Sequence, residues 1–311
     1  MEATGTKWRI YWEFSRPFTL LAPAMGMIGG GLMALGADPR FVSDWADTPW
    51  RACLNIAIGA VMAAVMNIGS NGLNQIYDLE IDRINKPARP LPSGRLSLRQ
   101  AWTITALSLA LGLLLSWSVN RECFAMAAVA ALLTACYSVP PARTKRWGVL
   151  ASLTIAIPRG LLLPVAGWST VKSVLVAEPW LVSLPLGLFV LGATSTKDFS
   201  DIEGDRAGGC RTLPVRFGVR ATAAIIAPFF VLPFGLWAWL AWKRFVSAPP
   251  TGLYAMAVAL PLIGAYTDIR ILRRPEELSK GENHISWKLI YLMMLLIYAG
   301  LALVYLLPRP G

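Results

Sequence analysis

Two groups of polar residues recur at intervals of three or four residues in an otherwise apolar chain. The groups are Asn74, Asp78 and Asp82, and Asp198, Asp201 and Asp205. Side chains four residues apart share one face of a helix, so each group predicts a carboxylate-lined helix end. The pattern Asp-x-Glu-x-Asp-Arg occurs at 78–83 and again at 201–206, which indicates an internal repeat. Such carboxylates suit the binding of divalent cations.

A shared cation site explains these carboxylates better than two unrelated solvated loops do. Like charges held close together repel one another and are costly beside a bilayer. Mg²⁺ prefers oxygen ligands and often completes its coordination shell with substrate phosphates. We therefore expect the two groups to approach each other around Mg²⁺ and a phosphate-bearing ligand.

Basic residues lie beside both acidic groups. The candidates for phosphate contacts are Arg89, Arg143, Lys145 and Lys197. A diphosphate leaving group needs fixed cations to stabilise the charge that develops as its C–O bond breaks. Arg159 follows Pro158 inside an apolar run, where a charge usually faces a polar cavity. Snorkelling of Arg159 to the membrane interface is the alternative.

The elements that position these residues are apolar helices. The 311-residue chain is 55% hydrophobic and only 15% charged, whereas a soluble domain has about 25% charged residues. Nine runs are close to the length that a bilayer core requires. The predicted spans are 17–36, 52–76, 101–119, 122–139, 148–168, 180–197, 221–242, 251–269 and 287–307. Such runs predict an all-α integral membrane protein, because runs this long and evenly apolar are unlike barrel strands.

The distribution of basic residues predicts the orientation of the bundle. Of 29 Lys and Arg residues, 21 lie in the amino terminus and the even-numbered loops, against 7 in the other loops and the carboxyl end. The positive-inside rule then places the amino terminus and both acidic motifs in the cytoplasm. A prokaryotic inner membrane is the simplest expected location of the protein. Topology accounts for most of the net charge of +11, so we expect no nucleic-acid partner.

The sequence also argues against several kinds of chemistry. It contains one histidine, His284, and four cysteines without a Cys-x-x-Cys pair. A structural zinc site or a histidine-dependent triad is therefore not expected.

The acidic groups resemble the N-x-x-x-D-x-x-x-D and D-x-x-x-D signatures of the UbiA superfamily of intramembrane prenyltransferases. The similarity extends over about 18–220, and we expect residues 1–311 to form a single domain of this type. The resemblance implies a bundle of nine transmembrane helices around a central cavity, with a cytoplasmic cap. It also implies a polyprenyl diphosphate substrate, with a C15–C20 chain as a guess, and Mg²⁺ as cofactor.

The resemblance assigns expected roles to the residues that match the motifs. The implied catalytic carboxylates are Asp78, Asp82, Asp201 and Asp205. The implied metal ligands are Asn74, Asp78, Asp82, Asp198, Asp201 and Asp205, of which Asp198 matches some branches only. The expected diphosphate contacts are Asn74, Arg89, Arg143, Lys145, Lys197 and Arg159. Among these, Lys145 follows Tyr137-Ser-Val-Pro-Pro, where the family places a basic residue.

The branch of the family determines the acceptor. Asn-Gln-x-Tyr-Asp, Tyr-Ser-Val-Pro-Pro and Lys-Asp-x-x-Asp are similar to homogentisate prenyltransferases, which favours an aromatic quinone precursor. Arg-Pro-Leu-Pro-Ser-Gly at 89–94 is more similar to chlorophyll synthases and to archaeal geranylgeranylglyceryl phosphate prenyltransferases. A non-aromatic acceptor is therefore the alternative. A membrane transporter is the alternative from another class, although it would place acidic residues along the spans.

Overall fold

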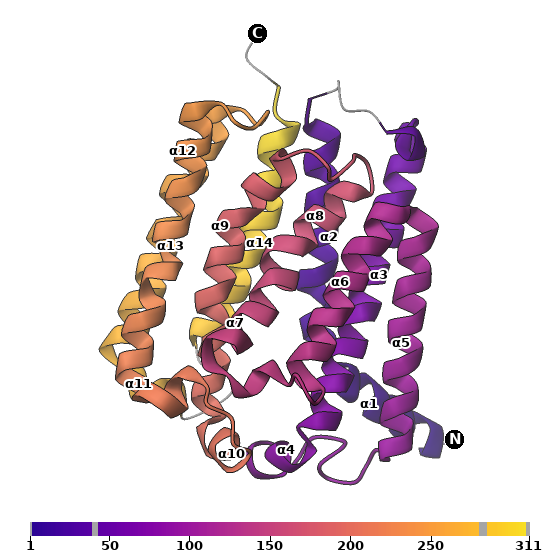
Figure 1. The fold of residues 1–311 in the computed structure, drawn as a ribbon, viewed down its shortest axis with the longest axis vertical. Helices are drawn as coiled ribbons and strands as arrows, with labels where there is room; N and C mark the ends of the chain where they lie inside the picture. The colour runs from indigo at the N-terminus through magenta and orange to yellow at the C-terminus, as the bar shows by residue number, and fades with distance from the viewer. Residues whose placement is uncertain (1, 39–42, 280–284, 309–311) are drawn as a thin grey trace.

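The computed structural model describes residues 2–38, 43–279 and 285–308, which are almost entirely helical (Figure 1). The α-helices are α1 (Glu2–Ser15), α2 (Leu21–Gly36), α3 (Pro49–Tyr77), α4 (Leu79–Asn85), α5 (Leu98–Val119), α6 (Arg121–Ser138), α7 (Gly148–Ala156), α8 (Leu163–Ser169), α9 (Glu178–Ala193), α10 (Ile202–Ala207), α11 (Leu213–Ile226), α12 (Gly235–Lys243), α13 (Pro250–Arg273) and α14 (Ile285–Leu306). Shorter helical segments used below are η1 (Pro17–Leu20), η3 (Thr144–Arg146), η4 (Ile157–Leu162), η5 (Thr194–Ser200), η6 (Ala227–Phe230), η7 (Leu232–Phe234) and η8 (Pro275–Ser279). The described ranges contain no β-strand, only an isolated bridge between Trp147 and Arg211.

The all-α membrane bundle predicted from the sequence is confirmed. Within the described ranges, eight helical segments are long and apolar enough to cross a membrane. The ninth predicted span, 122–139, corresponds to α6, an 18-residue helix that packs beside α3 and α5. Arg121 and Glu122 at its start make α6 less apolar than its neighbours, so the count of nine is approximate.

Prolines divide two of the predicted spans into shorter helices. Proline has no backbone N–H to donate and its ring displaces the preceding turn of the helix. At Pro158 the chain forms the π-helix η4 between α7 and α8. Between α11 and α12, the segments η6 and η7 contain Pro228 and Pro233. The first of these breaks places Arg159 in a non-α segment deep in the bundle.

Helices α2 and α8 pack so closely that their backbones are in contact. A Cβ atom built on Gly30 would lie 2.1 Å from the carbonyl oxygen of Pro164 and 2.8 Å from Cα of Gly167. No side chain fits at this distance, and small residues are what allow helices to pack tightly in a membrane. The α2–α8 contact therefore depends on both glycines.

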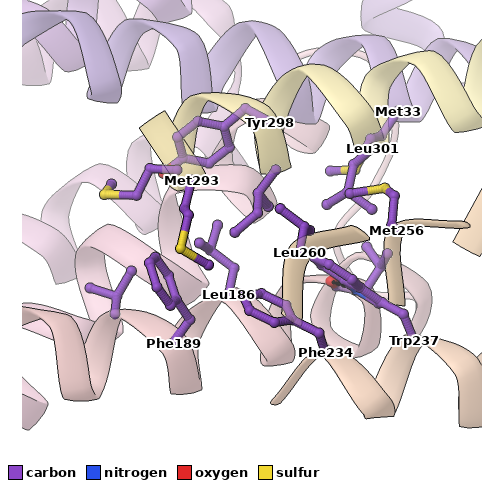
Figure 2. Close-up of a cluster of buried hydrophobic side chains, with 14 of the residues drawn as sticks. Met33, Leu186, Phe189, Phe234, Trp237, Met256, Leu260, Met293, Tyr298 and Leu301 are labelled. Atoms are coloured by element: carbon purple, nitrogen blue, oxygen red, sulfur yellow. Dashed lines mark hydrogen bonds between the residues drawn. The ribbon is translucent and has the colours of Figure 1, made fainter. Parts of the chain in front are cut away.

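A large apolar cluster fills the space between α9, α12, α13 and α14 (Figure 2). Phe189 of α9 lies 5.7 Å from the ring of Phe234, and Trp237 donates a hydrogen bond to the carbonyl of Val182 at 2.9 Å. Leu260 of α13 and Met293 of α14 complete this group of buried side chains. Because α9 leads directly into η5, this packing fixes the position from which the second acidic motif begins.

The two acidic motifs lie at one end of the bundle. The short helices α4 and α10 follow α3 and η5, and they pack against each other at the bottom of the view in Figure 1. The amino-terminal helix α1 lies at the same end, where buried Phe14 packs with Ile76 and Leu96. Residues 123 positions apart in the sequence thus reach the same place.

Candidate active site

Both motifs occur where one helix ends and a short one begins. Asp78 lies between α3 and α4 with φ −99° and ψ 14°, and Asp201 lies between η5 and α10 with φ −108° and ψ 7°. The backbone therefore turns in the same way at the first Asp of each Asp-x-Glu-x-Asp-Arg segment. The internal repeat seen in the sequence is also a repeat in local structure.

Asn85 joins the two short helices directly. Its Nδ2 donates to the carbonyl of Asp201 at 3.1 Å, and its Oδ1 accepts a hydrogen bond from the backbone N–H of Gly204 at 2.9 Å. A Cβ atom on Gly204 would lie 2.5 Å from Nδ2 of Asn85, so a larger residue there would displace the Asn85 side chain. Lys86 adds an ion pair in which Nζ lies 2.6 Å from Oδ1 of Asp201. These contacts place the first motif against the second.

Lys145 bridges the two motifs electrostatically. Its Nζ lies 2.7 Å from Oδ2 of Asp78 and 3.3 Å from Oδ1 of Asp205. Burial of Lys145 disfavours the ammonium, but Asp78 and Asp205 outweigh that penalty and raise its pKa well above the usual value. Lys145 therefore carries its charge between two carboxylates from different motifs.

Asp78 has further partners. Asn74 donates to its Oδ2 at 2.6 Å, and Arg143 donates to its Oδ1 at 3.2 Å and to the carbonyl of Tyr77 at 3.1 Å. Asp78 is only 3% exposed, and burial of a carboxylate is tolerated when several donors satisfy it. Three of the residues expected to act on a diphosphate thus surround one carboxylate.

Asp82 and Asp205, the second carboxylates of the two motifs, are less fully compensated. Arg89 lies 3.1 Å from Oδ2 of Asp82, and burial still raises the pKa of Asp82 above its ordinary value. Burial likewise raises the pKa of Asp205, although Lys145 opposes the shift. Both carboxylate oxygens of Asp205 are buried, and in the described part of the chain no donor meets them in good hydrogen-bond geometry; Lys145 lies 3.3 Å from Oδ1 as an ion-pair partner. Acceptors of this kind would be satisfied by a cation.

The donor set fits Mg²⁺ bound together with a phosphate. In the described ranges, no three His, Cys, Asp or Glu side chains lie close enough together to hold a metal ion by themselves. Basic side chains lie between the carboxylates instead. Mg²⁺ commonly uses one or two carboxylates, with waters and substrate phosphates as its other ligands. The unsatisfied oxygens of Asp205, close to Lys145, match that arrangement.

A cavity lies between the motifs and the centre of the bundle. Its lining includes Asn74 of α3, Lys197 of η5 and Arg159 of η4. Lys197 donates to the hydroxyl of Tyr137 at 2.9 Å and lies 5.1 Å from the centre of its ring. Farther from the motifs, Met27, Met62 and Leu163 make the lining apolar. The cavity therefore has a polar end near Asp78 and an apolar body, as an amphipathic substrate requires.

The structure distributes the expected residues over two layers. The first is a charged layer made of the motif carboxylates and their basic partners. It consists of Asp78, Asp82, Asp201, Asp205, Lys145, Arg143, Arg89 and Lys86. Asn74, Lys197 and Arg159 line the cavity, and the buried Asp198 lies one residue from Lys197. All four cysteines are free thiols, and His284 lies outside the described residues.

Several residues at the site were not among the sequence candidates. Asn85 and Lys86 follow the first motif, and Tyr137 holds Lys197. Asn67, Ser70 and Asn71 line the cavity one or two turns before Asn74. Polar residues three and four apart within an otherwise apolar span are the signal that would have identified this wall of α3.

Comparison with known proteins agrees with the fold and the motifs. The model of the UbiA prenyltransferase family matches residues 24–287. The chain is 29% identical to a homogentisate phytyltransferase from a Synechocystis strain, over 73% of this chain and 76% of that one. It is 28% identical to a digeranylgeranylglyceryl phosphate synthase from Sulfurisphaera tokodaii, over 69% of this chain and 72% of the relative.

Among solved structures, a UbiA homolog from Archaeoglobus fulgidus bound to GPP and Mg²⁺ superposes with a TM-score of 0.72 at 21% identity, covering 96% of this chain and 99% of that one. This likeness establishes the shared fold. The family match covers far more than half of the sequence. The chain therefore belongs to the UbiA prenyltransferase family and is a multi-pass integral membrane prenyltransferase.

Proposed function

We propose that this prenyltransferase moves a polyprenyl group from its diphosphate to an aromatic acceptor of the homogentisate type, with Mg²⁺ as cofactor. The observation that carries the proposal is the bridge of Lys145 between Asp78 and Asp205 at the polar end of the cavity. It supports a single charged layer built from both motifs. A diphosphate in this layer would direct its apolar chain into the cavity.

The residues around this layer suit the binding of a diphosphate. Positive charge comes from three separate segments of the chain, which carry Lys86 and Arg89, Arg143 and Lys145, and Lys197. Arginine grips phosphate oxygens in a bidentate manner, while lysine acts as a point charge. Lys145, Arg143, Arg89 and Lys86 pair with carboxylates, whereas Lys197 donates to the hydroxyl of Tyr137. Incoming phosphates would exchange partners with these groups. Mg²⁺, held by Asp78, Asp82, Asp201 and Asp205 with help from Asn74 and Asp198, would supply Lewis-acid charge to the phosphate oxygens.

The reaction follows from the chemistry of an allylic diphosphate. The C–O bond to the prenyl carbon breaks, and the diphosphate leaves with the electron pair. Lys145 and Arg143 stabilise the developing negative charge from fixed positions. The electron-rich ring carbon of the acceptor forms the new C–C bond and then loses its proton, which the released diphosphate can accept. The apolar lining of the cavity keeps water away from the allylic cation.

The choice of an aromatic acceptor rests on motifs and relatives. One relative is named a homogentisate phytyltransferase, and others are named for prenyl transfer to an acylprenylphloroglucinol and to glycinol. The alternative, a glyceryl phosphate acceptor, is favoured by the relatives named digeranylgeranylglyceryl phosphate synthase. The prenyl chain is proposed to be C15–C20.

A direct assay tests the proposed reaction. Membranes that contain the protein receive a labelled C15 or C20 prenyl diphosphate, Mg²⁺, and homogentisate, chlorophyllide or geranylgeranylglyceryl phosphate in separate reactions. Prenylated homogentisate is the expected product. A product with only one of the other acceptors would overturn the aromatic assignment. Diphosphate release that persists without Mg²⁺, or in Asp78→Ala and Asp201→Ala, would overturn the proposed site.

Matched controls lie within the motifs themselves. Glu80 and Glu203 are the exposed middle residues of the two Asp-x-Glu-x-Asp segments. Glu80→Ala and Glu203→Ala remove one negative charge each without reaching the charged layer. We expect these two variants to retain activity. Equal losses in all four variants would show that net charge, rather than the Asp positions, controls the reaction.

The proposed orientation places α4, α10 and the amino terminus in the cytoplasm of a prokaryotic host. It rests on the bias of basic residues toward this end of the bundle. Cys53 lies exposed near the start of α3, at the opposite end. A maleimide that cannot cross membranes should therefore label Cys53 in intact cells. Labelling of Cys53 only after cell disruption would indicate the opposite orientation.

A further inference from the structure

A second pocket lies at the motif end of the bundle, outside the site described above. It is lined by the last two turns of α13, by η8 and by the start of α14. Tyr266, Ile269 and Ile285 supply its apolar lining, and Glu277 is an acidic member. Three arginines contribute the rest: Arg270, Arg273 and Arg274. The pocket thus carries a net positive charge beside apolar side chains.

Local contacts hold two of the three arginines beside this hollow. The guanidinium of Arg270 lies 5.8 Å from the centre of the Tyr266 ring, within the range of a cation–π interaction. Arg274 donates to Glu277 at 3.1 Å. Glu277 can neutralise one of the three charges, so among the described lining residues two positive charges are left to attract an anion.

An apolar stripe on α13 leads from the pocket along the bundle. Val258, Leu262 and Tyr266 follow one another at intervals of four residues and therefore share a helix face. Val258 and Leu262 are 66% and 68% exposed, as expected of side chains that face lipid. Arg270 continues the same series at the end of the span. The surface is therefore apolar along the membrane and positive at its edge.

We propose that the pocket binds the phosphate headgroup of an anionic phospholipid from the leaflet at the motif end, with an acyl chain along the stripe of α13. The charge is complementary to a phosphodiester, and arginine forms bidentate hydrogen bonds with phosphate oxygens. Basic pockets between membrane helices at an interface bind anionic headgroups in this way. The stripe distinguishes a lipid from a soluble phosphate, which would gain nothing from Val258 and Leu262.

The pocket is connected to the second acidic motif through η8. This segment begins directly after Arg274 and packs against η5 and α11. Leu278 of η8 and Phe199 of η5 are 2% and 1% exposed and belong to the same apolar core. A bound headgroup would therefore stabilise the segment that supports Lys197 and Asp198. Slower hydrogen exchange at 275–279 in the presence of the lipid is the expected sign.

Lipid retention measured by native mass spectrometry tests this proposal on the full-length protein in detergent. The probes are phosphatidylglycerol, phosphatidylcholine as the neutral control, and inorganic phosphate as competitor. The pocket variant carries Arg270→Gln, Arg273→Gln and Arg274→Gln. The matched control carries Arg9→Gln, Arg99→Gln and Arg216→Gln, three exposed arginines of the same end. Both variants lose the same net charge.

We expect the wild type to retain phosphatidylglycerol in preference to phosphatidylcholine. The pocket variant should retain it about 100-fold more weakly, since each interfacial arginine contributes roughly fivefold. The control should retain it normally. Equal losses in the two variants would attribute the effect to net charge, and displacement by millimolar phosphate would identify a free-anion site; either result overturns the proposal. If the triple variant fails to fold by size-exclusion chromatography, Arg273→Glu with Arg216→Glu as its control provides the comparison at equal net charge.

Discussion

The two acidic motifs are copies in sequence and in backbone conformation, but their charges are compensated differently. Asp78 in the first motif interacts with Asn74, Arg143 and Lys145. Asp205 in the second motif has only the longer ion pair with Lys145, and no donor among the described residues meets either oxygen in good hydrogen-bond geometry. The basic residues of loop 140–147 thus satisfy Asp78 and leave Asp205 with room for a cation.

The titration behaviour of the carboxylates reflects the same difference. Burial would raise the pKa of Asp201, but Lys86 at 2.6 Å reverses the effect and lowers it. At Asp82 and Asp205 burial prevails over the nearby cations, and the pKa is raised. One residue of the second motif is therefore stabilised as an anion and the other is not. The charge of Asp205 is the one that an added cation would relieve most.

Replacing Asp78 or Asp205 by Asn should give the largest effects and test most directly whether the two residues are compensated differently. Asp78→Asn leaves Lys145 and Arg143 without their main partner, and we expect a loss of about 3 kcal/mol in unfolding free energy. Asp205→Asn removes an uncompensated anion while Lys145 keeps Asp78, so the metal-free protein should be equally or more stable. Both variants should lose roughly 1,000-fold in prenyl transfer, because both remove charge at the phosphate layer.

Thermal unfolding without Mg²⁺, paired with the transfer assay, measures these effects. The informative result is the opposite sign of the stability changes. If Asp205→Asn destabilised the metal-free protein as much as Asp78→Asn, the charge of Asp205 would be as fully compensated as that of Asp78.

Removing the bridging charge should have the next largest effect. Lys145→Met leaves Asp78 and Asp205 buried with less compensation, which costs about 3 kcal/mol of stability for a broken buried ion pair. Activity should fall at least 100-fold. Added Mg²⁺ should stabilise this variant more than the wild type, since the cation replaces the missing charge. A Mg²⁺ response no larger than that of the wild type would contradict the proximity of the metal to Asp205. Lys145→Arg, which retains the charge, should recover part of the activity.

The dependence of stability on pH should separate the two kinds of carboxylate. Asp82 and Asp205 have raised pKa values in the folded protein, so they oppose folding at neutral pH, and the penalty fades as pH falls through those values. Asp201 has a lowered pKa, so its contribution is present above the unfolded value of 3.8 and is lost as pH falls through its folded pKa. Metal-free protein should therefore become more stable on mild acidification, and Mg²⁺ should weaken this trend.

Unfolding temperatures between pH 5 and 8, with EDTA or with Mg²⁺, provide the measurement. Asp205→Asn is the matched control, since it lacks one of the raised groups and should show a smaller pH response. A metal-free stability that declines steadily from pH 8 to pH 5 would contradict the penalty assigned to Asp82 and Asp205, because the contribution of Asp201 is lost only below pH 3.8.

The sequence was sufficient to predict the bundle and most of the charged layer. Apolar runs of bilayer length have one stable solution, and repeated spacing at 78–83 and 201–206 indicated a common site. The contacts of Asn85 with Asp201 and Gly204 were not predictable, because they join residues about 120 positions apart and depend on the crossing of α4 and α10. The pairing of Lys197 with Tyr137 depends likewise on how η5 meets α6.

The sequence also did not show which carboxylate each basic residue would pair with. Arg95 follows the first motif as Arg89 does, yet it pairs with Glu13 of α1 and not with a motif carboxylate. Spacing along the chain identifies candidates for a charged layer. The tertiary packing of α1 against the loop after α4 decides which candidates enter it.

The smallest effect should come from loosening the contact between the motifs without changing any charge. Asn85→Ala removes two hydrogen bonds to the α10 backbone, and Asn55→Ala removes two comparable bonds to the carbonyls of Trp45 and Thr170 at the opposite end. Each variant should lose about 1–2 kcal/mol of stability. Only Asn85→Ala should also lose activity, about tenfold, because a small displacement of α10 misplaces Asp201 and Asp205 relative to Asp78. Equal activities in the two variants at equal stability would mean that the motifs tolerate independent movement. The charged layer would then act as two separate groups that the ligand brings together.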